Sequence, residues 1–368
     1  MNNALIIGSG PAGSSSARVL ADAGWSVRVF EKRPHIAGNC YDEYDKKGIL
    51  VHRYGPHFFR TNSLSLITWL SAYTSWIPGR YYVRAKVGNK LIPMPISLST
   101  MTALKKNVFT KEDFEEYLER ERVHILDPKN AQEQCLALFG RELYETLFRG
   151  YTIKQWGAEP GELDPSITAR IPLRFNWDER YVSEDYQVMP ADGYYQMFRR
   201  MLDHDNIIVK TNCYFEPSAV MKMKNDFNCI IYTGKIDEFF QFRYGKLGYR
   251  SLSFEWKYFK DNYIQPCVTI NYPGDFDYTR TVEIKHVTGQ DCEGTTICYE
   301  YPRSQGEPFY PVLNKENQDK YTKYKALADK QEPKIFFLGR LAEYKYFNMD
   351  HTFERSIALA NQIWQNRR

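Results

Sequence analysis

Residues 4–33 read ALIIGSGPAGSSSARVLADAGWSVRVFEKR, and this stretch decides the fold of the chain. It begins with an apolar segment, Ala4 to Ile7, that predicts a buried strand. Gly8, Gly10 and Gly13 come directly after it and complete the pattern G-x-G-x-x-G. Between a strand and a helix, such a turn lets the backbone approach a pyrophosphate closely. We therefore predict a βαβ unit that binds the ADP half of a dinucleotide.

The helix and the acidic residue after the glycine turn support this prediction. The helix is expected to run to about Ala23, and it directs its free amide groups and positive dipole end at the phosphates. Glu31 ends the second strand 23 positions after Gly8, where a carboxylate can accept hydrogen bonds from a ribose diol. An ordinary α/β domain with a glycine-rich turn would not need all of these parts. The residues predicted to contact the cofactor here are Gly8, Gly10, Pro11, Ala12, Gly13, Glu31 and Lys32.

Length and composition limit the class of protein. The chain has 368 residues, too many for one simple core, so two or three lobes are expected. Its 28 tyrosines predict either a ligand cleft built from stacking and hydroxyl groups or a tyrosine-rich core. The net charge is only +4 and no basic block occurs, so nucleic acid is not expected as a partner.

The N-terminal sequence and the cysteines indicate the cellular compartment of the protein. The chain opens directly into the first predicted strand without a signal peptide, and no apolar run approaches the roughly 20 residues of a membrane span. The seven cysteines are scattered and form no C-x-x-C pair. We therefore expect a cytoplasmic protein with reduced thiols, no metal site and no membrane partner.

Beyond the βαβ unit, helical and strand-rich stretches alternate along the chain. Residues 62–73 predict a helix capped by Asn62, and residues 80–96 predict a β-hairpin around Gly88-Asn89. Residues 99–150 carry helical patterns without strand signals, as expected of an inserted helical lobe. The remaining predicted segments are strand-rich at 165–195 and 245–310, strands at 230–234 and Lys334 to Leu338, and a helix at 349–366.

The residues near and after Glu31 bear on the identity of the dinucleotide. FAD and NAD both fit the glycine fingerprint. The ending E-K-R and the segment Ile36-Ala37-Gly38-Asn39-Cys40-Tyr41 favour FAD, because flavoprotein chains commonly turn there to face the flavin. Taken by itself, the fingerprint would indicate hydride transfer.

Together these elements predict an α/β fold: a discontinuous, Rossmann-like FAD-binding domain, an inserted helical lobe and an antiparallel β-sheet substrate domain. The FAD-binding domain is expected in pieces because flavoproteins with two dinucleotide domains commonly finish with a strand, a glycine and a long helix. The predicted boundaries are 1–78, 204–244 and 333–368 for the FAD-binding domain, 98–164 for the helical lobe, and 79–97, 165–203 and 245–332 for the β-sheet domain.

Several longer sequence words resemble those of the bacterial UDP-galactopyranose mutase family over nearly the whole chain. Besides GSGPAG and EKR, they are HRYGPHFFRTN (52–62), GYTIKQWG (150–157), ARIPLRF (169–175), GYRSLSFE (248–255), YTRTVE (278–283) and GRLAEYKYFNMD (339–350). The resemblance implies an FAD enzyme that interconverts the pyranose and furanose forms of UDP-galactose without net redox change. It also implies that the FAD must be reduced and that flavin N5 forms a covalent adduct with the sugar.

The same resemblance implies roles for individual residues. In this reaction the protein must orient the sugar and neutralise the departing diphosphate, for which arginine forks suit better than lysines. Arg170 is implied on a mobile loop that closes over the substrate, Arg280 fixed opposite it, and His57 beside the flavin. The residues implied in substrate binding are Arg60, Tyr151 (stacking on uracil), Trp156, Tyr181, Arg250, Tyr310 and Tyr346, with Asn39, Arg340 and Met349 added to the cofactor site.

Three features depart from the usual family pattern. Arg60 stands where typical bacterial members have His, the hairpin around Arg80-Tyr81-Tyr82 lacks the usual Asn, and Asn348 replaces an Asp. Because arginine is longer and offers more donors, we hypothesise that Arg60 binds a sugar substituent, such as the 2-acetamido group of UDP-N-acetylgalactosamine. The alternative is that Arg60 pairs with a carboxylate near the flavin. The exact sugar, and the choice of UDP or dTDP, stay open.

Two other functions share the N-terminal fingerprint. One is a conventional FAD oxidoreductase such as an amine oxidase, which would need an apolar substrate cage. The other is a non-catalytic nucleotide-binding protein that retains FAD. The arginine-rich words count against the first, and the intact GYTIKQWG and YTR words count against the second. The family is commonly dimeric, so a homodimer is expected.

Overall fold

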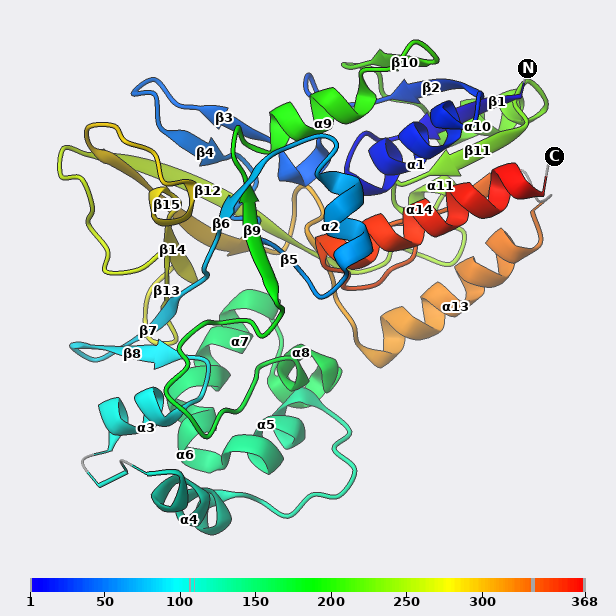
Figure 1. Cartoon of the computed structure of the whole chain (residues 1–368). Coiled ribbons are helices and arrows are strands. Elements are labelled where there is room, and N and C mark those ends of the chain that lie inside the picture. The colour runs from blue at the N-terminus through cyan, green and yellow to red at the C-terminus, as the bar shows by residue number, and fades with distance from the viewer. Residues whose placement is uncertain (1, 106, 109, 332–334, 367–368) are drawn as a thin grey trace.

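The computed structural model describes residues 2–105, 107–108, 110–331 and 335–366 (Figure 1). Three parts are visible: a parallel sheet with helices on both faces, a larger mixed sheet, and a lobe of short helices at the other end of the molecule. The predicted α/β fold class is confirmed. The predicted domain boundaries stay a prediction.

The glycine fingerprint belongs to a five-stranded sheet in which every neighbouring pair is parallel. In spatial order its strands are β10 (Ile207–Lys210), β2 (Ser26–Phe30), β1 (Asn3–Ile7), β11 (Cys229–Tyr232) and β17 (Ile335–Phe337). Because all five strands run in the same direction, strands that are far apart in the sequence have their carboxyl ends at the same edge of the sheet. The predicted strands at 230–234 and 334–338 correspond to β11 and β17, with Lys334 outside the described residues.

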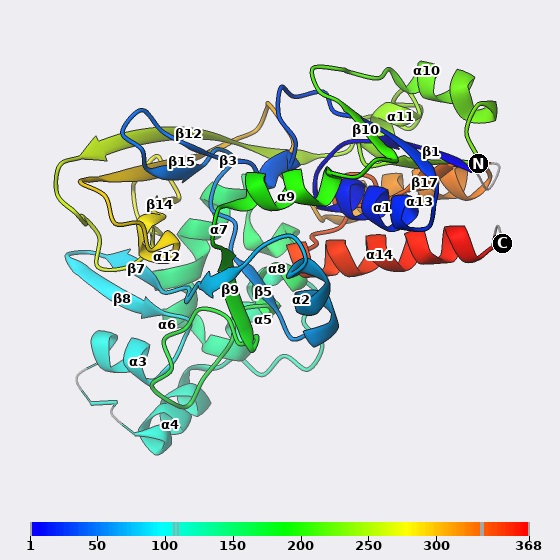
Figure 2. The same cartoon turned by 45° about the horizontal axis from the view of Figure 1, so that its top comes forward.

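Both faces of this sheet are buried, which explains why its strands read as continuous apolar runs. Ala4 and Ile6 of β1 pack toward α1 (Pro11–Asp22) and α14 (Met349–Gln365). Leu5 packs on the opposite face, near α10 (Pro217–Lys222) and α11 (Ile236–Phe239). Helices α1 and α14 lie side by side in both views (Figures 1 and 2). The first and last helices thus close one domain.

The larger, mixed sheet has seven strands. In spatial order they are β16 (Tyr310–Pro311), β12 (Tyr249–Phe259), β15 (Thr295–Arg303), β14 (Arg280–Glu283), β13 (Thr269–Asn271), β7 (Val83–Val87) and β8 (Lys90–Met94). Strands β7 and β8 form the hairpin predicted at 80–96. All neighbouring pairs are antiparallel except β13 with β7, which come from distant parts of the chain and are parallel.

Two small sheets link the large ones. One contains β5 (Phe59–Thr61), β9 (Tyr186–Pro190) and β6 (Trp76–Pro78), and the other contains β3 (Asp42–Tyr44) and β4 (Leu50–His52). Residues 165–203 provide β9 to the first and then α9 (Tyr194–Leu202), which packs against α1. Strand β9, the one strand that residues 165–203 contribute to these sheets, therefore lies outside the seven-stranded sheet.

The helix predicted at 62–73 is shorter than expected, and its predicted cap is wrong. The helix, α2, spans Leu64–Leu70, and the hydroxyl of Ser63 accepts from the amide of Leu66. The side chain of Asn62 instead accepts from the amide of Asp185, across the chain. A tertiary contact has therefore taken the residue that the local pattern favoured as the cap.

The helical lobe is built from short helices, the first three of which begin at a side-chain cap. Its helices are α3 (Leu98–Leu104), α4 (Lys111–Glu121), α5 (Ala131–Phe139), α6 (Arg141–Leu143), a π-helical turn at Tyr144–Arg149, α7 (Gly150–Trp156) and α8 (Ser166–Ala169). Helices α12 (Lys285–Thr288) and α13 (Lys315–Asp329) lie outside this lobe. Among the described residues, no helix is long and apolar enough to cross a membrane.

Candidate functional site

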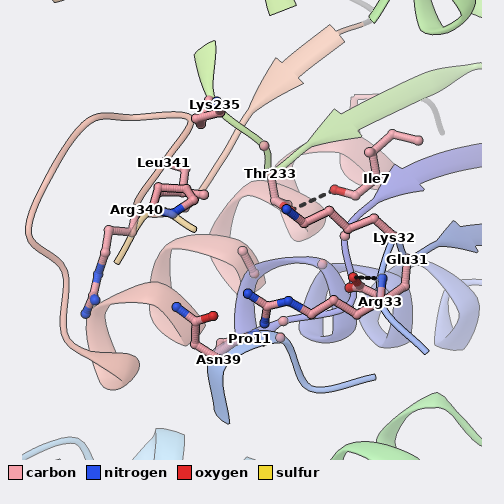
Figure 3. Close-up of a pocket in the computed structure, with 18 of the residues that line it drawn as sticks. Ile7, Pro11, Glu31, Lys32, Arg33, Asn39, Thr233, Lys235, Arg340 and Leu341 are labelled. Atoms are coloured by element: carbon pink, nitrogen blue, oxygen red, sulfur yellow. Dashed lines mark hydrogen bonds between the residues drawn. The ribbon is translucent and has the colours of Figure 1, made fainter. Parts of the chain in front are cut away.

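A cavity of about 270 Å³ lies at the carboxyl ends of the parallel strands, where such sheets bind their ligands. The turns after four strands line it (Figure 3): Gly8 after β1, Glu31 after β2, Thr233 after β11 and Arg340 after β17. All ten residues predicted to bind the cofactor line this cavity: Gly8, Gly10, Pro11, Ala12, Gly13, Glu31, Lys32, Asn39, Arg340 and Met349.

Two glycines of the fingerprint, Gly8 and Gly13, occupy positions where a larger residue does not fit. Gly8 has φ +101°, a conformation that side chains disfavour. A Cβ on Gly13 would lie 1.9 Å from the carbonyl oxygen of Gly8, and a Cβ on Gly38 would lie 2.9 Å from the Cα of Gly10. The glycine turn is therefore packed backbone on backbone, and the start of α1 carries no side-chain cap that would cover it.

Glu31 is held rigidly at the ribose end of the cavity. Its carboxylate accepts hydrogen bonds from the amide and hydroxyl of Ser9 and from the amide of Arg33, and only 5% of the residue is exposed. The Arg33 guanidinium lies 4.1 Å from the ring centre of Tyr54. A bare glycine turn, a helix start and a fixed carboxylate together fit the diphosphate and ribose of a dinucleotide.

A second cavity, of about 230 Å³, lies between the seven-stranded sheet and the helical lobe. Residues from the two lobes and from the C-terminal segment line it, including Tyr151, Arg170, Arg280 and Tyr346. The two cavities meet along a shared boundary formed by Asn39, His57, Phe309, Arg340, Asn348 and Met349. The first cavity is called the cradle from here on. A group bound in the cradle can therefore reach a ligand in the second cavity.

Two of the arginines in the second cavity are held in different ways. Arg280 begins β14 and pairs across the sheet with Glu300 of β15, its Nε lying 2.8 Å from a fully buried carboxylate oxygen. Burial opposes the charge of Arg280, but the Glu300 carboxylate outweighs it and raises the Arg280 pKa well above its usual value. Arg170 follows α8, is solvent-exposed, and lies 4.7 Å from the ring centre of Tyr346.

An aromatic and cationic stack forms one wall. The rings of Tyr310 and Tyr346 stack with centroids 5.5 Å apart, and Trp156 lies 6.1 Å from each. Arg340 contacts both tyrosine rings and donates to the carbonyls of Phe309 and Phe347. Burial alone would raise the pKa of Tyr346, but the guanidinium groups of Arg170 and Arg340 lower it to about 8. The wall therefore offers cations and hydroxyl donors to an anion.

Helix α7 presents Tyr151, Thr152, Gln155 and Trp156 to the second cavity. Burial raises the pKa of Tyr151, so its hydroxyl stays neutral and can donate. Arg250, predicted to bind substrate, is not among the cavity-lining residues. Its guanidinium donates to the carbonyls of Lys154 and Gln155 and so binds the C-terminal end of α7. Its predicted role in substrate binding stays a prediction.

His57 lies on the boundary between the cavities and is neutral. Burial lowers its pKa to about 4. Its Nδ1 lies 2.9 Å from the carbonyl of Gly55, which can only accept, so Nδ1 carries the proton and Nε2 is an acceptor. The amide of His57 donates to Nδ1 of His52, itself buried and neutral. The side chain is therefore oriented by its own loop.

The three departures from the family pattern lie at the second cavity. Arg60 lines it and donates to the Glu184 carboxylate at 2.9 Å, and Glu184 itself is not among the lining residues of either cavity. Tyr81, from the unusual hairpin segment, also lines the cavity, and its carbonyl accepts from the amide of Tyr181. Asn348 precedes α14 and lines both cavities. All three are placed where they can contact a ligand.

Several lining residues had no clear sequence signal. Thr233 lies in the segment IIYTG directly after β11, at the sheet edge, so the position of its strand could have identified it. Asn271 and Gln155 line the second cavity without belonging to a pattern. Glu307 reaches the first cavity from a distant loop, where it pairs with Lys32 and Arg33. Within the described chain, no group of three or more His, Cys, Asp or Glu side chains is placed to hold a metal ion.

Comparison with known proteins agrees with this geometry. Residues 146–346, more than half of the chain, match the family model described as UDP-galactopyranose mutase. Residues 6–70 match an NAD(P)-binding Rossmann-like domain. A probable UDP-galactopyranose mutase from Klebsiella pneumoniae is 36% identical over 98% of this chain and 94% of its own. The chain belongs to the UDP-galactopyranose mutase family. The protein is thus an isomerase of the mutase type, and its family and cradle imply a flavin.

Other relatives are also named as sugar mutases, one of them for a different nucleotide sugar. A dTDP-fucopyranose mutase from Escherichia coli is 35% identical over 100% of this chain and 99% of its own. A UDP-galactopyranose mutase from Mycoplasma genitalium is 32% identical over 98% and 94%. The crystal structure of a reduced UDP-galactopyranose mutase superposes with a TM-score of 0.78 at 15% identity, covering 100% of this chain and 94% of that one. The fold is therefore shared along the whole chain.

Proposed function

We propose that this mutase interconverts UDP-galactopyranose and UDP-galactofuranose, with reduced FAD as its cofactor. The observation that carries the proposal is the shared boundary of the two cavities. On one side lies a cradle for a dinucleotide, and on the other lies a cavity lined by Arg170, Arg280 and Arg340. Three guanidinium groups suit a diphosphate, whereas the substrate cage of an amine oxidase would be apolar. Family membership counts against the oxidoreductase alternative.

The arginines would act on the leaving group. When the bond between the anomeric carbon and UDP breaks, the diphosphate gains negative charge, which Arg280 and Arg170 can neutralise. The hydroxyls of Tyr310 and Tyr346 can donate to the same oxygens. Because Arg280 is fixed by Glu300, its guanidinium needs little reorganisation when the charge develops.

The base and the flavin would lie at opposite ends of the UDP-sugar. We propose that Tyr151 and Trp156 stack on the uracil, a contact that typically contributes about 1–3 kcal/mol per base. The glycine cradle, Glu31 and Asn39 would hold FAD, which supplies a nucleophilic nitrogen when it is bound and reduced. His57 would accept a hydrogen bond at Nε2 and orient the ring system rather than transfer protons.

Arg60 is proposed to determine which sugar is accepted. It lines the second cavity while paired with Glu184, so it can turn a donor toward a substituent on the sugar. We propose that the enzyme also converts UDP-N-acetylgalactopyranose. In an Arg60→His variant, we expect the turnover of the 2-acetamido substrate to fall relative to that of UDP-galactofuranose. An unchanged ratio would rule out this role and leave the ion pair as the reason for Arg60.

A direct assay tests the proposed reaction. The purified protein, reduced with dithionite, is incubated with UDP-galactofuranose, its 2-acetamido analogue and dTDP-fucofuranose, and the products are separated by chromatography. We expect conversion of the UDP-sugars only when the flavin is reduced. Faster conversion of the dTDP-sugar would overturn the proposed substrate, and conversion without reductant would overturn the proposed role of FAD.

We further propose that the enzyme is a cytoplasmic homodimer. None of the seven cysteines, all of which lie among the described residues, forms a disulfide, which supports a reducing compartment. Analytical ultracentrifugation of the FAD-loaded protein would measure the oligomeric state. A single species with the mass of one chain at micromolar concentration would contradict the dimer.

A further inference from the structure

The ammonium group of Lys154 lies within a ring of backbone carbonyls. Its Nζ lies 2.6 Å from the oxygen of Tyr272, 2.8 Å from those of Gly274 and Phe276, and 3.3 Å from that of Tyr278. An ammonium has three protons, so the three short contacts use all of its donors. Lys154 therefore binds alternate residues of one loop through a single charged group.

This loop connects β13 to β14, and its base lies in the substrate cavity. Asn271 and Arg280 pair across the two strands, and both line the second cavity. Between them, the amide of Tyr272 donates to Thr279 and the amide of Phe276 donates to Gly274. The carbonyls of Tyr272, Gly274, Phe276 and Tyr278 face the lysine. The position of Arg280 is thus linked to the conformation that Lys154 stabilises.

Lys154 belongs to α7, which carries the residues proposed to bind the base. Tyr151 and Trp156 of this helix line the same cavity as Arg280. A second contact brings α7 and the loop together, because a Cβ on Gly150 would lie only 2.2 Å from the carbonyl oxygen of Pro273. The helix and the loop are therefore in backbone contact at one end of α7 and joined by the ammonium one turn later.

We propose that Lys154 is a positioning residue of the substrate site, which fixes the distance between the base-binding face of α7 and the diphosphate-binding Arg280. The inference rests on the proposed binding of a UDP-sugar in the second cavity. Lys154 itself does not line that cavity, so it acts through the two segments that it joins. A rigid ligand that contacts both segments binds well only when their spacing is held.

Removing the charge should release the loop. The carbonyls of Tyr272, Gly274 and Phe276 would lose a charged donor, and such hydrogen bonds are stronger than neutral ones. Asp275 and Asp277 are exposed on the same loop and lie close enough to raise the pKa of Lys154, against the lowering by burial. Without the ammonium their charges would be uncompensated. The loop is then expected to open, so that α7 is no longer held at a fixed distance from the strand end that carries Arg280.

The experiment uses the full FAD-loaded protein and three variants. Lys154→Met removes the charge, and Lys154→Arg keeps a charged donor. The matched control is Lys285→Met, because Lys285 is also buried and donates to the carbonyls of Cys292 and Gly294, outside both cavities. UDP binding is measured by calorimetry, loop opening by hydrogen exchange of the amides of residues 272–280, and folding by thermal melting and flavin content.

For Lys154→Met we expect UDP affinity to fall about tenfold or more, with faster exchange in residues 272–280 and unchanged flavin content. Lys154→Arg should recover part of the affinity, and Lys285→Met should bind UDP like the parent protein even where its melting temperature falls. Unchanged UDP affinity in Lys154→Met would overturn the inference, whether or not exchange rises. If the parent protein itself binds no UDP, the proposed function fails instead, and the two failures are thereby distinguished.

Discussion

The cofactor cradle and the substrate cavity adjoin one another, yet they are built in opposite ways. The cradle comes from turns at one sheet edge, and its glycine turn and Glu31 lie within residues 4–39. Its glycine turns are packed backbone on backbone, as the close approach of Gly13 to Gly8 and of Gly38 to Gly10 shows. The substrate cavity is lined by side chains from both lobes and the C-terminal segment. A local motif can specify the first, whereas only the assembled fold can form the second.

The sharpest test of this difference is Arg280→Lys. Lysine keeps a charge beside Glu300 but cannot form the guanidinium fork, so we expect turnover to fall about 100- to 1000-fold. The flavin spectrum and flavin content should not change, because Arg280 lines only the second cavity. Steady-state kinetics on the reduced enzyme and absorbance at the flavin band measure both. Arg303→Lys, on the exposed end of β15, is the matched control. Loss of flavin in Arg280→Lys would show that the two regions are not separable.

The reciprocal test is Gly13→Ala in the cradle. The added methyl would lie 1.9 Å from a backbone oxygen that cannot move freely. Overpacking of this kind costs about 1–3 kcal/mol, which corresponds to a roughly 10- to 100-fold weaker binding of FAD. Fluorescence titration of the deflavinated protein measures this affinity. Gly161→Ala, with an ordinary 3.5 Å contact to Gln132, should bind FAD normally. Retention of full FAD affinity by Gly13→Ala would contradict a backbone-built cradle.

A pH titration tests the side-chain character of the substrate cavity. Arg170 and Arg340 lower the pKa of Tyr346 to about 8, although burial opposes them. Below this pH the neutral hydroxyl can donate to a diphosphate. Above it, the phenolate competes with the diphosphate for both arginines. UDP affinity should therefore fall as pH rises through about 8, by at most about tenfold per pH unit for one proton. Calorimetry at several pH values checks this, and Tyr346→Phe should remove the step. A step that survives in Tyr346→Phe belongs to another group.

The smallest effect is expected at the outer edge of the cradle. Glu307 pairs with Lys32 at 2.8 Å, but the two side chains are 51% and 46% exposed. Exposed ion pairs contribute about 0–1 kcal/mol, so Glu307→Gln should change FAD affinity by less than about fivefold. The same fluorescence titration measures it, with Glu316→Gln on α13 as the control. A larger loss would mean that side chains, and not only backbone, hold the cofactor.

The two regions also differ in how well the sequence predicted them. The ten residues expected at the cofactor all line the cradle, because a fixed spacing of glycines leaves few conformations available. Of the ten residues expected at the substrate, only Arg250 does not line the second cavity. It belongs to the word GYRSLSFE, but its guanidinium binds carbonyls at the end of α7. Sequence words identify a residue, whereas the direction of its side chain depends on the groups that pack around it.

The sequence by itself determined the βαβ unit, the hairpin of β7 and β8 and the place of the chain in its family. Each of these depends on residues that are close together in the sequence, or on sequence words that are long enough to be specific to one family. Only the tertiary structure decided that Glu300 fixes Arg280, that Ser63 rather than Asn62 caps α2, and that Lys154 joins α7 to the β13–β14 loop. Arg280 and Glu300 are 20 positions apart, and Lys154 and Tyr278 are 124 positions apart. The change of cap at α2 depends on the contact between Asn62 and Asp185, which are also far apart in the sequence. No local pattern encodes such pairs, because their energy exists only once the lobes have assembled.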